Sequence, residues 1–215
     1  MNTPIDAALW NGWLASGAEE LGLELDGQKI GLLRQFAAEL LEANQTFNLT
    51  GITDPFEMAV KLMLDSMYPG KFIPDGARVL DLGTGAGFPG VPIKIARPGL
   101  SMRLIDSRRK RINFLKYAIA QLGIKDIRAE QIRAEDLAKR EGGFYDVVVC
   151  RAVSSMNDLA GLCAPLVKQG GMLLAMKGDP DKAAREAAMF DTVEIHTYRL
   201  PWLDTPRAVV ALRFA

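Results

Sequence analysis

Hydrophobic and polar residues follow one spacing in the first part of the chain and another in the rest. Over the first 67 residues the apolar positions recur at helical intervals, most clearly from Gln28 to Phe47, which predicts amphipathic helices. Asp54, Pro55 and Glu57 have the order of a helix start: a capping carboxylate, a proline in the first turn and a glutamate at the third position. We therefore expect the N-terminal part to be helical.

From residue 78 onward, short apolar runs alternate with helical patterns. We expect strands at 78–82, 102–106, 127–131, 146–151, 172–176, 193–199 and 208–214, and helices at 89–96, 109–122, 157–166 and 180–189. Strands separated by helices form a mostly parallel sheet with both faces covered. No clear helix separates the last two strands, so we expect them to form a hairpin that makes one edge of the sheet antiparallel.

The two patterns meet in a segment rich in proline and glycine, Tyr68 to Ala77, and such residues commonly mark a boundary. The sequence thus predicts an N-terminal helical extension, residues 1–75, followed by an α/β domain, residues 76–215. The whole chain has 215 residues, enough for one domain with a small extension.

Composition excludes several classes of protein. Hydrophobic residues make up 49% and charged residues 24%, as in ordinary soluble proteins. No apolar run has the length of a membrane span, and the first ten residues do not resemble a signal peptide. Two cysteines suit a reducing compartment, and a single histidine with no zinc-type cysteine spacing argues against a metal site. We expect a cytoplasmic protein without a membrane segment or a metal.

The net charge of zero hides an uneven distribution. Between Lys94 and Lys116 lie eight basic residues and one acidic residue, giving this stretch a charge of +7. Such a band predicts a local phosphate-binding surface. Its densest part follows the second predicted strand, and we take these four residues as substrate-binding candidates: Arg108, Arg109, Lys110 and Arg111. The alternative is a solvated basic face.

A glycine-rich loop after the first predicted strand is the most informative segment. Gly85, Gly87 and Gly90 match the dinucleotide pattern G-x-G-x-x-G. The other frame uses Gly83, Gly85 and Gly87, preceded by Asp81 at the end of the strand. A carboxylate there repels a pyrophosphate and favours the cationic methionine end of S-adenosylmethionine. The second frame, which is the usual entry to a methyl-donor site, is therefore the better interpretation.

Two further strand ends point to the same edge of the sheet. Asp106 ends the second strand and can accept both ribose hydroxyls of an adenosine cofactor; alternatively it caps the next helix. After the third strand, the backbone of Ala134 or the carboxylate of Glu135 can contact an adenine, unless these residues only begin a solvated helix.

The fourth and fifth strand ends bear on the chemistry. Arg151 can face a cofactor carboxylate or an RNA phosphate, and Lys177 is expected to point into the same cleft. Cys150 is near the position of a nucleophile for carbon methylation, but we interpret it as a buried strand residue. His196 is interpreted as a surface residue of a strand. The Asn/Asp-Pro-Pro-aromatic motif of exocyclic amine methylation is absent at the fourth strand end.

Together these motifs resemble the RsmG (GidB) family, bacterial methyltransferases that act on guanine N7 of 16S ribosomal RNA. The resemblance rests on Asn48-Leu49-Thr50, Leu64-Asp65-Ser66, the loop from Asp81 to Phe88-Pro89-Gly90, Asp106-Ser107, Arg133-Ala134-Glu135, Arg151-Ala152 and Lys177-Gly178. It implies that Gly83, Phe88, Ala134, Glu135 and Arg151 contact S-adenosylmethionine. Family members often have a histidine directly after the basic residue at Lys61, where this chain has Leu62, so no role of that histidine carries over.

The resemblance implies a Rossmann-like class I methyltransferase fold and a partner that is 16S ribosomal RNA or the small ribosomal subunit; we expect a monomer. Guanine N7 carries a lone pair and no proton, so the reaction needs alignment of sulfur, methyl and N7 and no general base. Two other functions stay open: methylation of a small molecule or protein, and, less favoured, nicotinamide-dependent oxidation.

Overall fold

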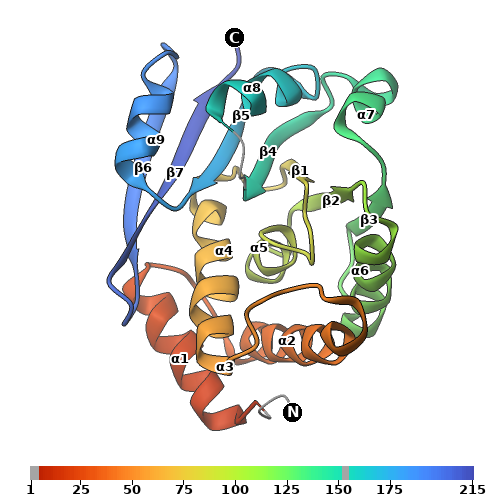
Figure 1. Ribbon diagram of the computed structural model, residues 1–215, viewed down its shortest axis with the longest axis vertical. Helices are drawn as coiled ribbons and strands as arrows, with labels where there is room; N and C mark the ends of the chain where they lie inside the picture. Colours follow the sequence, from red (N-terminus) through yellow and green to blue (C-terminus); the bar gives the residue numbers. More distant parts are fainter. Residues whose placement is uncertain (1–4, 152–154) are drawn as a thin grey trace.

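Seven strands form one sheet in the computed structural model, which describes residues 5–151 and 155–215 (Figure 1). The strands are β1 (Arg78–Leu82), β2 (Ser101–Asp106), β3 (Ile127–Gln131), β4 (Tyr145–Arg151), β5 (Val167–Lys177), β6 (Val193–Leu200) and β7 (Thr205–Arg213). Their order across the sheet is β3-β2-β1-β4-β5-β7-β6. The pairs from β3 to β5 are parallel, whereas β7 runs antiparallel to both β5 and β6. The predicted mostly parallel sheet with one antiparallel edge is confirmed.

The register brings the start of β7 to the edge where β4 and β5 end. Arg151 pairs with Met176 in β5, and Met176 pairs with Val209 in β7. Residues just before Val209 therefore lie at the carboxyl edge of the parallel strands, which is where ligands bind in open α/β sheets.

Helices cover both faces of the sheet, because successive strand residues point to opposite sides. Val147 and Val149 of β4 join one apolar cluster with the N-terminal helices, α5 (Gly90–Ala96) and α6 (Arg109–Leu122). Val148 and Cys150 join a second cluster with α7 (Ala134–Glu141), α8 (Met156–Cys163) and α9 (Pro180–Ala187). Figure 1 shows these two groups of helices on opposite sides of the sheet.

The N-terminal part is helical, as predicted. It contains α1 (Ala7–Glu20), α2 (Gly27–Phe47), and a run made of α3 (Pro55–Glu57), the π-helical η1 (Met58–Leu64), α4 (Asp65–Met67) and the 3-10 helix η2 (Tyr68–Phe72). The predicted helix start is confirmed, since the Asp54 side chain accepts a hydrogen bond from the Glu57 N–H at 2.9 Å. These helices share one apolar cluster with the sheet, and the division at residues 75 and 76 stays a prediction.

Most other element ends lie within three residues of those predicted, but β5 begins at Val167, five residues earlier. Val167 pairs with Tyr145 across a shift in register. Gly170 and Gly171 follow Val167 and interrupt the apolar pattern, which hides this part of the strand from a periodicity argument.

The interpretation of His196 as a surface residue holds only in part. Its side chain is only 29% exposed, and its ring stacks on Phe72 with 3.9 Å between the centroids. On the same strand, Tyr198 stacks on Tyr68 at 3.7 Å. The helix η2 covers this face of β6, and it comes from a segment more than a hundred residues earlier in the chain.

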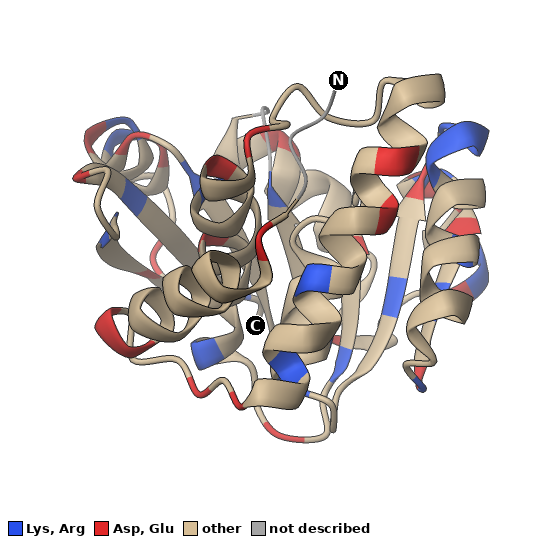
Figure 2. Cartoon of the chain, turned by 90° about the horizontal axis from the view of Figure 1, so that it is seen from below, with Lys and Arg blue, Asp and Glu red and all other residues tan. Residues whose placement is uncertain are grey.

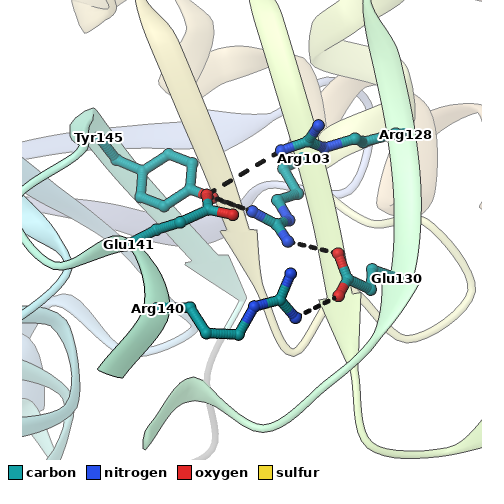
Figure 3. A network of polar contacts seen from close by, with 6 residues as sticks. All are labelled: Arg103, Arg128, Glu130, Arg140, Glu141 and Tyr145. Atoms are coloured by element: carbon teal, nitrogen blue, oxygen red, sulfur yellow. Dashed lines mark hydrogen bonds and ion pairs between the residues drawn. The ribbon is translucent and has the colours of Figure 1, made fainter. Parts of the chain in front are cut away.

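A buried arginine of β2 connects to three other elements, β3, α7 and β4 (Figure 3). Arg103 of β2 is 3% exposed. It donates hydrogen bonds to the carboxylates of Glu130 and Glu141 and, at 2.9 Å, to the hydroxyl of Tyr145. These contacts attach the end of α7 to β3 and β4. Buried arginines of this kind require paired carboxylates.

None of the helices in residues 5–151 and 155–215 combines the length and the hydropathy needed to cross a membrane.

Candidate functional site

The glycine loop leaves the carboxyl end of β1 and leads into α5. Gly83, Gly85 and Gly87 have φ angles of 71°, 60° and 105°, a region that side chains rarely allow. Gly90 has no positive φ; an added Cβ there would lie 2.3 Å from Leu104 and 2.5 Å from the carboxylate of Asp81. The three glycines of the methyl-donor frame are thus required by the turn, and Gly90 lets α5 approach the sheet closely.

Asp81 is fully buried at the base of this loop. One carboxylate oxygen accepts hydrogen bonds from the Thr84 hydroxyl at 2.6 Å and from the Gly90 N–H at 2.7 Å. The other oxygen has no hydrogen-bond partner among the described residues. Burial raises the pKa of Asp81 to about 7. Asp81 therefore shapes the loop with one oxygen and keeps the other available for a donor.

Asp106, at the end of β2, joins the loop to α6. Its carboxylate accepts hydrogen bonds from the N–H of Arg108 at 2.8 Å and of Gly85 at 3.1 Å, and from the guanidinium of Arg111 at 3.0 Å. The contact with the start of the next helix, which the sequence offered only as the alternative, is present. Acceptance of ribose hydroxyls stays a prediction.

The segment after β3 borders a hollow beside Asp106. Ala134 and Glu135 begin α7, with Ala134 buried and Glu135 exposed, so the helix that the sequence left open is present. The hollow measures about 470 Å³ and is lined by Ser107, Gln131, Ile132, Arg133 and Asp136. Two strand ends thus frame a recess of the kind expected for a nucleoside.

Phe88 is mainly a core residue. Its side chain is 8% exposed, and its ring lies against that of Phe36 in α2, with 5.5 Å between the centroids. Little of the Phe88 side chain is therefore left for a ligand.

Arg151, at the end of β4, faces a buried carboxylate from the N-terminal part. Its guanidinium lies 3.3 Å from Asp65, and Arg207 of β7 lies 3.6 Å from the same carboxylate. The Tyr198 hydroxyl donates to Asp65 at 2.6 Å. Sequence reasoning singled out Leu64-Asp65-Ser66 without giving it a role, and it missed Arg207 altogether. Ala152, the second residue of the Arg151-Ala152 motif, lies outside the described residues.

Lys177 does not stand free in the cleft. Its side chain is 10% exposed and its ammonium pairs with Glu186 of α9 at 3.0 Å. Glu186 also accepts a hydrogen bond from the N–H of Met156. This lysine links β5 to α9 and α8.

The basic band is narrower than its sequence suggests. Lys94 and Arg103 are each only 3% exposed, because their charged ends are satisfied by carbonyls and carboxylates inside the fold. Arg108, Arg109 and Lys110 are exposed at the start of α6. Figure 2 shows basic residues gathered at one end of the right-hand helix. The accessible positive charge is therefore concentrated next to Asp106.

The cysteines are not suited to act as nucleophiles. Cys150 is buried, as predicted, and so is Cys163; burial raises the pKa of the Cys150 thiol well above its usual range. Within the described ranges, no group of three or more metal-ligating side chains comes together.

Comparisons with known proteins agree with this geometry. The family model described as rRNA small subunit methyltransferase G (GidB) matches residues 29–199. A protein named Ribosomal RNA small subunit methyltransferase G from Pelotomaculum thermopropionicum is 38% identical, covering 93% of this chain and 88% of its own. One of the same name from Staphylococcus epidermidis is 36% identical, covering 88% and 83%.

Solved structures support the fold. A predicted O-methyltransferase from Agrobacterium tumefaciens is 18% identical with a TM-score of 0.56, covering 70% of this chain and 81% of its own. A SAM-dependent methyltransferase from Aquifex aeolicus is 15% identical with a TM-score of 0.54, covering 75% and 94%. The predicted class I methyltransferase fold is confirmed. The resemblance in the motifs is confirmed as well, by the family model and by relatives matched over most of the sequence: the chain belongs to the rRNA small subunit methyltransferase G (GidB) family.

Proposed function

We propose that this protein transfers a methyl group from S-adenosylmethionine to N7 of a guanine in 16S ribosomal RNA of the small subunit. The observation that carries the proposal is the coincidence of family membership with a methyl-donor frame of glycines at the carboxyl edge of the sheet. The curated relatives carry small-subunit ribosomal RNA in their names.

The residues at this edge fit S-adenosylmethionine, which supplies a methyl group on a cationic sulfur. Asp81 has a buried oxygen without a partner, suited to the cationic methionine end. An added Cβ at Gly83 would meet nothing within 4 Å, so a ligand can approach the backbone there. Gly85 extends this accessible stretch of backbone. Arg151 lies one strand away and completes it with a positive charge for the methionine carboxylate.

The nucleoside end of the cofactor is bound by Asp106 and the start of α7. An ionised carboxylate offers about four lone-pair sites, and three contacts already use Asp106. Asp106 therefore has room for one ribose hydroxyl, where the sequence suggested two. The adenine lies in the hollow beside Ala134 and Glu135, in contact with the Ala134 backbone.

The chemistry of this reaction needs no general base. The N7 lone pair attacks the methyl group, the bond from carbon to sulfur breaks, and the positive charge moves to the base. No proton has to be removed, so the protein contributes alignment and electrostatic stabilisation. Cys150 is no candidate nucleophile because its raised pKa keeps it a neutral thiol, and His196 is stacked on Phe72.

The RNA lies against the exposed start of α6 in this proposal. Arg108, Arg109 and Lys110 are solvent-exposed and adjoin the cofactor edge through Asp106. They suit contacts with phosphates, which position a nucleic acid without reading its sequence. Lys177 contributes mainly through its ion pair with Glu186 and less by direct contact with the RNA. The enzyme works in the cytoplasm, in keeping with its two free cysteines, and as a monomer.

The test is methylation of small ribosomal subunits, and of free 16S RNA, taken from cells that lack this protein. The full chain is incubated with S-adenosylmethionine, and the RNA is then cleaved chemically at N7-methylguanosine and mapped. One cleavage site that depends on the protein is expected. Methylation of an exocyclic amine or a ribose, or no methylation of either substrate, would contradict the proposal.

A further inference from the structure

Two guanidinium groups from separate strands converge on a single buried carboxylate. Asp65 is buried in α4. Arg151 of β4 and Arg207 of β7 lie 3.3 and 3.6 Å from the same oxygen of Asp65. The other oxygen accepts the Tyr198 hydroxyl. We call Asp65, Arg151, Arg207 and Tyr198 the Asp65 cluster.

The cluster has a surplus of positive charge. Burial and the adjacent Asp65 raise the pKa of Tyr198, so its hydroxyl stays neutral. Two arginines against one aspartate leave a net charge of +1. In the described part of the chain, no second carboxylate lies within ion-pair distance of Arg151 or Arg207. A partly buried surplus charge of this kind favours binding of an anion.

Both guanidiniums can still donate hydrogen bonds. Their distances to Asp65 exceed the usual range for an N–H···O hydrogen bond, and Arg207 makes one further bond, to the Pro206 carbonyl at 3.0 Å. Each guanidinium carries five N–H groups. The side chains are 30% and 19% exposed, so a ligand can reach them.

The cluster lies on the same sheet edge as the glycine loop but is displaced from it. Lys177 at the end of β5 pairs with Ala208, which puts Arg207 at the carboxyl edge. Three strand spacings separate β7 from β1 in the sheet order, a distance of about 14 Å. The backbone of Arg151 is one spacing from β1, whereas that of Arg207 is two spacings further away, and the two side chains meet at Asp65.

We propose that the Asp65 cluster binds an oxyanion, a phosphate of the RNA strand beside the methylated guanosine, with Arg207 as the donor and Asp65 as the residue that positions it beside Arg151, which the proposed function assigns to the methionine carboxylate. The inference rests on the proposed function and adds to it a phosphate subsite with a specific residue, Arg207. The carboxylate of the methionine end is the other oxyanion available, and the experiment separates the two.

The test pairs a protein variant with a modified RNA. Synthetic target RNAs carry an uncharged methylphosphonate at one position at a time around the methylated guanosine, and kcat/KM is measured for the wild-type protein and for Arg207→Met. One methylphosphonate is expected to lower the wild-type value by about tenfold to a hundredfold. On unmodified RNA, the kcat/KM of Arg207→Met should be lower than the wild-type value by a similar factor. On the RNA with the sensitive methylphosphonate, the kcat/KM of the variant should fall little further.

Arg213→Met is the matched control. Arg213 lies in the same strand at the opposite edge, is 57% exposed and pairs only weakly with Glu194, at 3.9 Å. Its substitution should leave kcat/KM and the methylphosphonate pattern unchanged. Affinity for S-adenosylmethionine, measured by calorimetry, should be unchanged in Arg207→Met.

Other results would overturn the inference. If the fold-loss in kcat/KM caused by Arg207→Met multiplies with the fold-loss caused by each methylphosphonate, the two changes are independent and Arg207 contacts no phosphate. If the affinity for S-adenosylmethionine falls tenfold, the oxyanion is the cofactor carboxylate. If Arg207→Met fails to fold, the wild-type protein on the set of methylphosphonate RNAs and the variant Arg207→Lys decide the question, because lysine keeps the charge but loses the planar fork. If no single methylphosphonate position lowers the wild-type kcat/KM, the subsite is refuted. Wild-type activity on small ribosomal subunits and on free 16S RNA tests the proposed function separately, and its absence on both would refute the proposed function and this inference together.

Discussion

Asp81 gives cofactor binding a defined pH dependence. Burial raises the pKa of Asp81 to about 7 in the protein without ligand, and a cationic ligand favours the ionised form. If only that form binds S-adenosylmethionine, the affinity reaches a plateau above pH 8. Below pH 7 it falls about tenfold for each pH unit. Calorimetry from pH 5.5 to 8.5 measures this directly, and Asp81→Asn should show a flat and weak profile. An unchanged wild-type affinity across this range would refute the reasoning.

The same pKa predicts an unusual slope in stability. The ordinary pKa of aspartate is about 3.9, so the folded protein holds a proton that the unfolded chain releases between pH 4 and 7. The resulting stabilisation is complete below pH 4 and is lost as the pH rises through 7, amounting to about 4 kcal/mol in total. Urea unfolding of the ligand-free protein at several pH values should show this loss. Asp81→Asn should lack it, and equal slopes in the two proteins would contradict the assignment.

Three further changes test the site and its support. Asp106→Ala should weaken S-adenosylmethionine binding by about 1.5–3 kcal/mol; calorimetry that finds unchanged affinity would reduce Asp106 to a link between the loop and α6. Reversing both Arg108 and Arg109 to glutamate should weaken RNA binding and flatten its salt dependence, measured by filter binding, while stability holds because both residues are exposed and acids suit a helix start. An unchanged salt slope would place the RNA elsewhere. Arg103→Met should lower the free energy of unfolding by about 1.5–3 kcal/mol near pH 7, because the partly buried carboxylates of Glu130 and Glu141 lose the hydrogen bonds that Arg103 donates. The pKa values of its partners Glu130 and Glu141 are lowered. For Glu130, burial raises the pKa but the hydrogen bonds from Arg103 and Arg140 outweigh it, and for Glu141 the Arg103 hydrogen bond is the main cause. The stability deficit of the variant should therefore shrink as these carboxylates become protonated in acid, and a deficit independent of pH would contradict this account.

The sequence by itself determined the fold class and one half of the site. The spacing of apolar residues and the positions of turn residues are local properties of the sequence. Parallel strands then bring all their carboxyl ends to one edge of the sheet. The residues directly after each strand, such as Asp81, Gly83 and Asp106, could therefore be grouped without coordinates. The motif Phe88-Pro89-Gly90 and its neighbours added the family, because those side chains recur together in few other contexts.

Only the tertiary structure decided where long side chains end. Lys177, which was predicted to point into the cleft, turns toward α9. Arg103, which was counted in the basic band, is buried among carboxylates from other elements. Arg207 escaped prediction because β7 is antiparallel: its site residue lies near the start of the strand and not after its end. Asp65 meets its partners across 86 or more residues of sequence. Such contacts depend on how distant segments pack and on which way a flexible side chain finds its partner, and no local pattern encodes either.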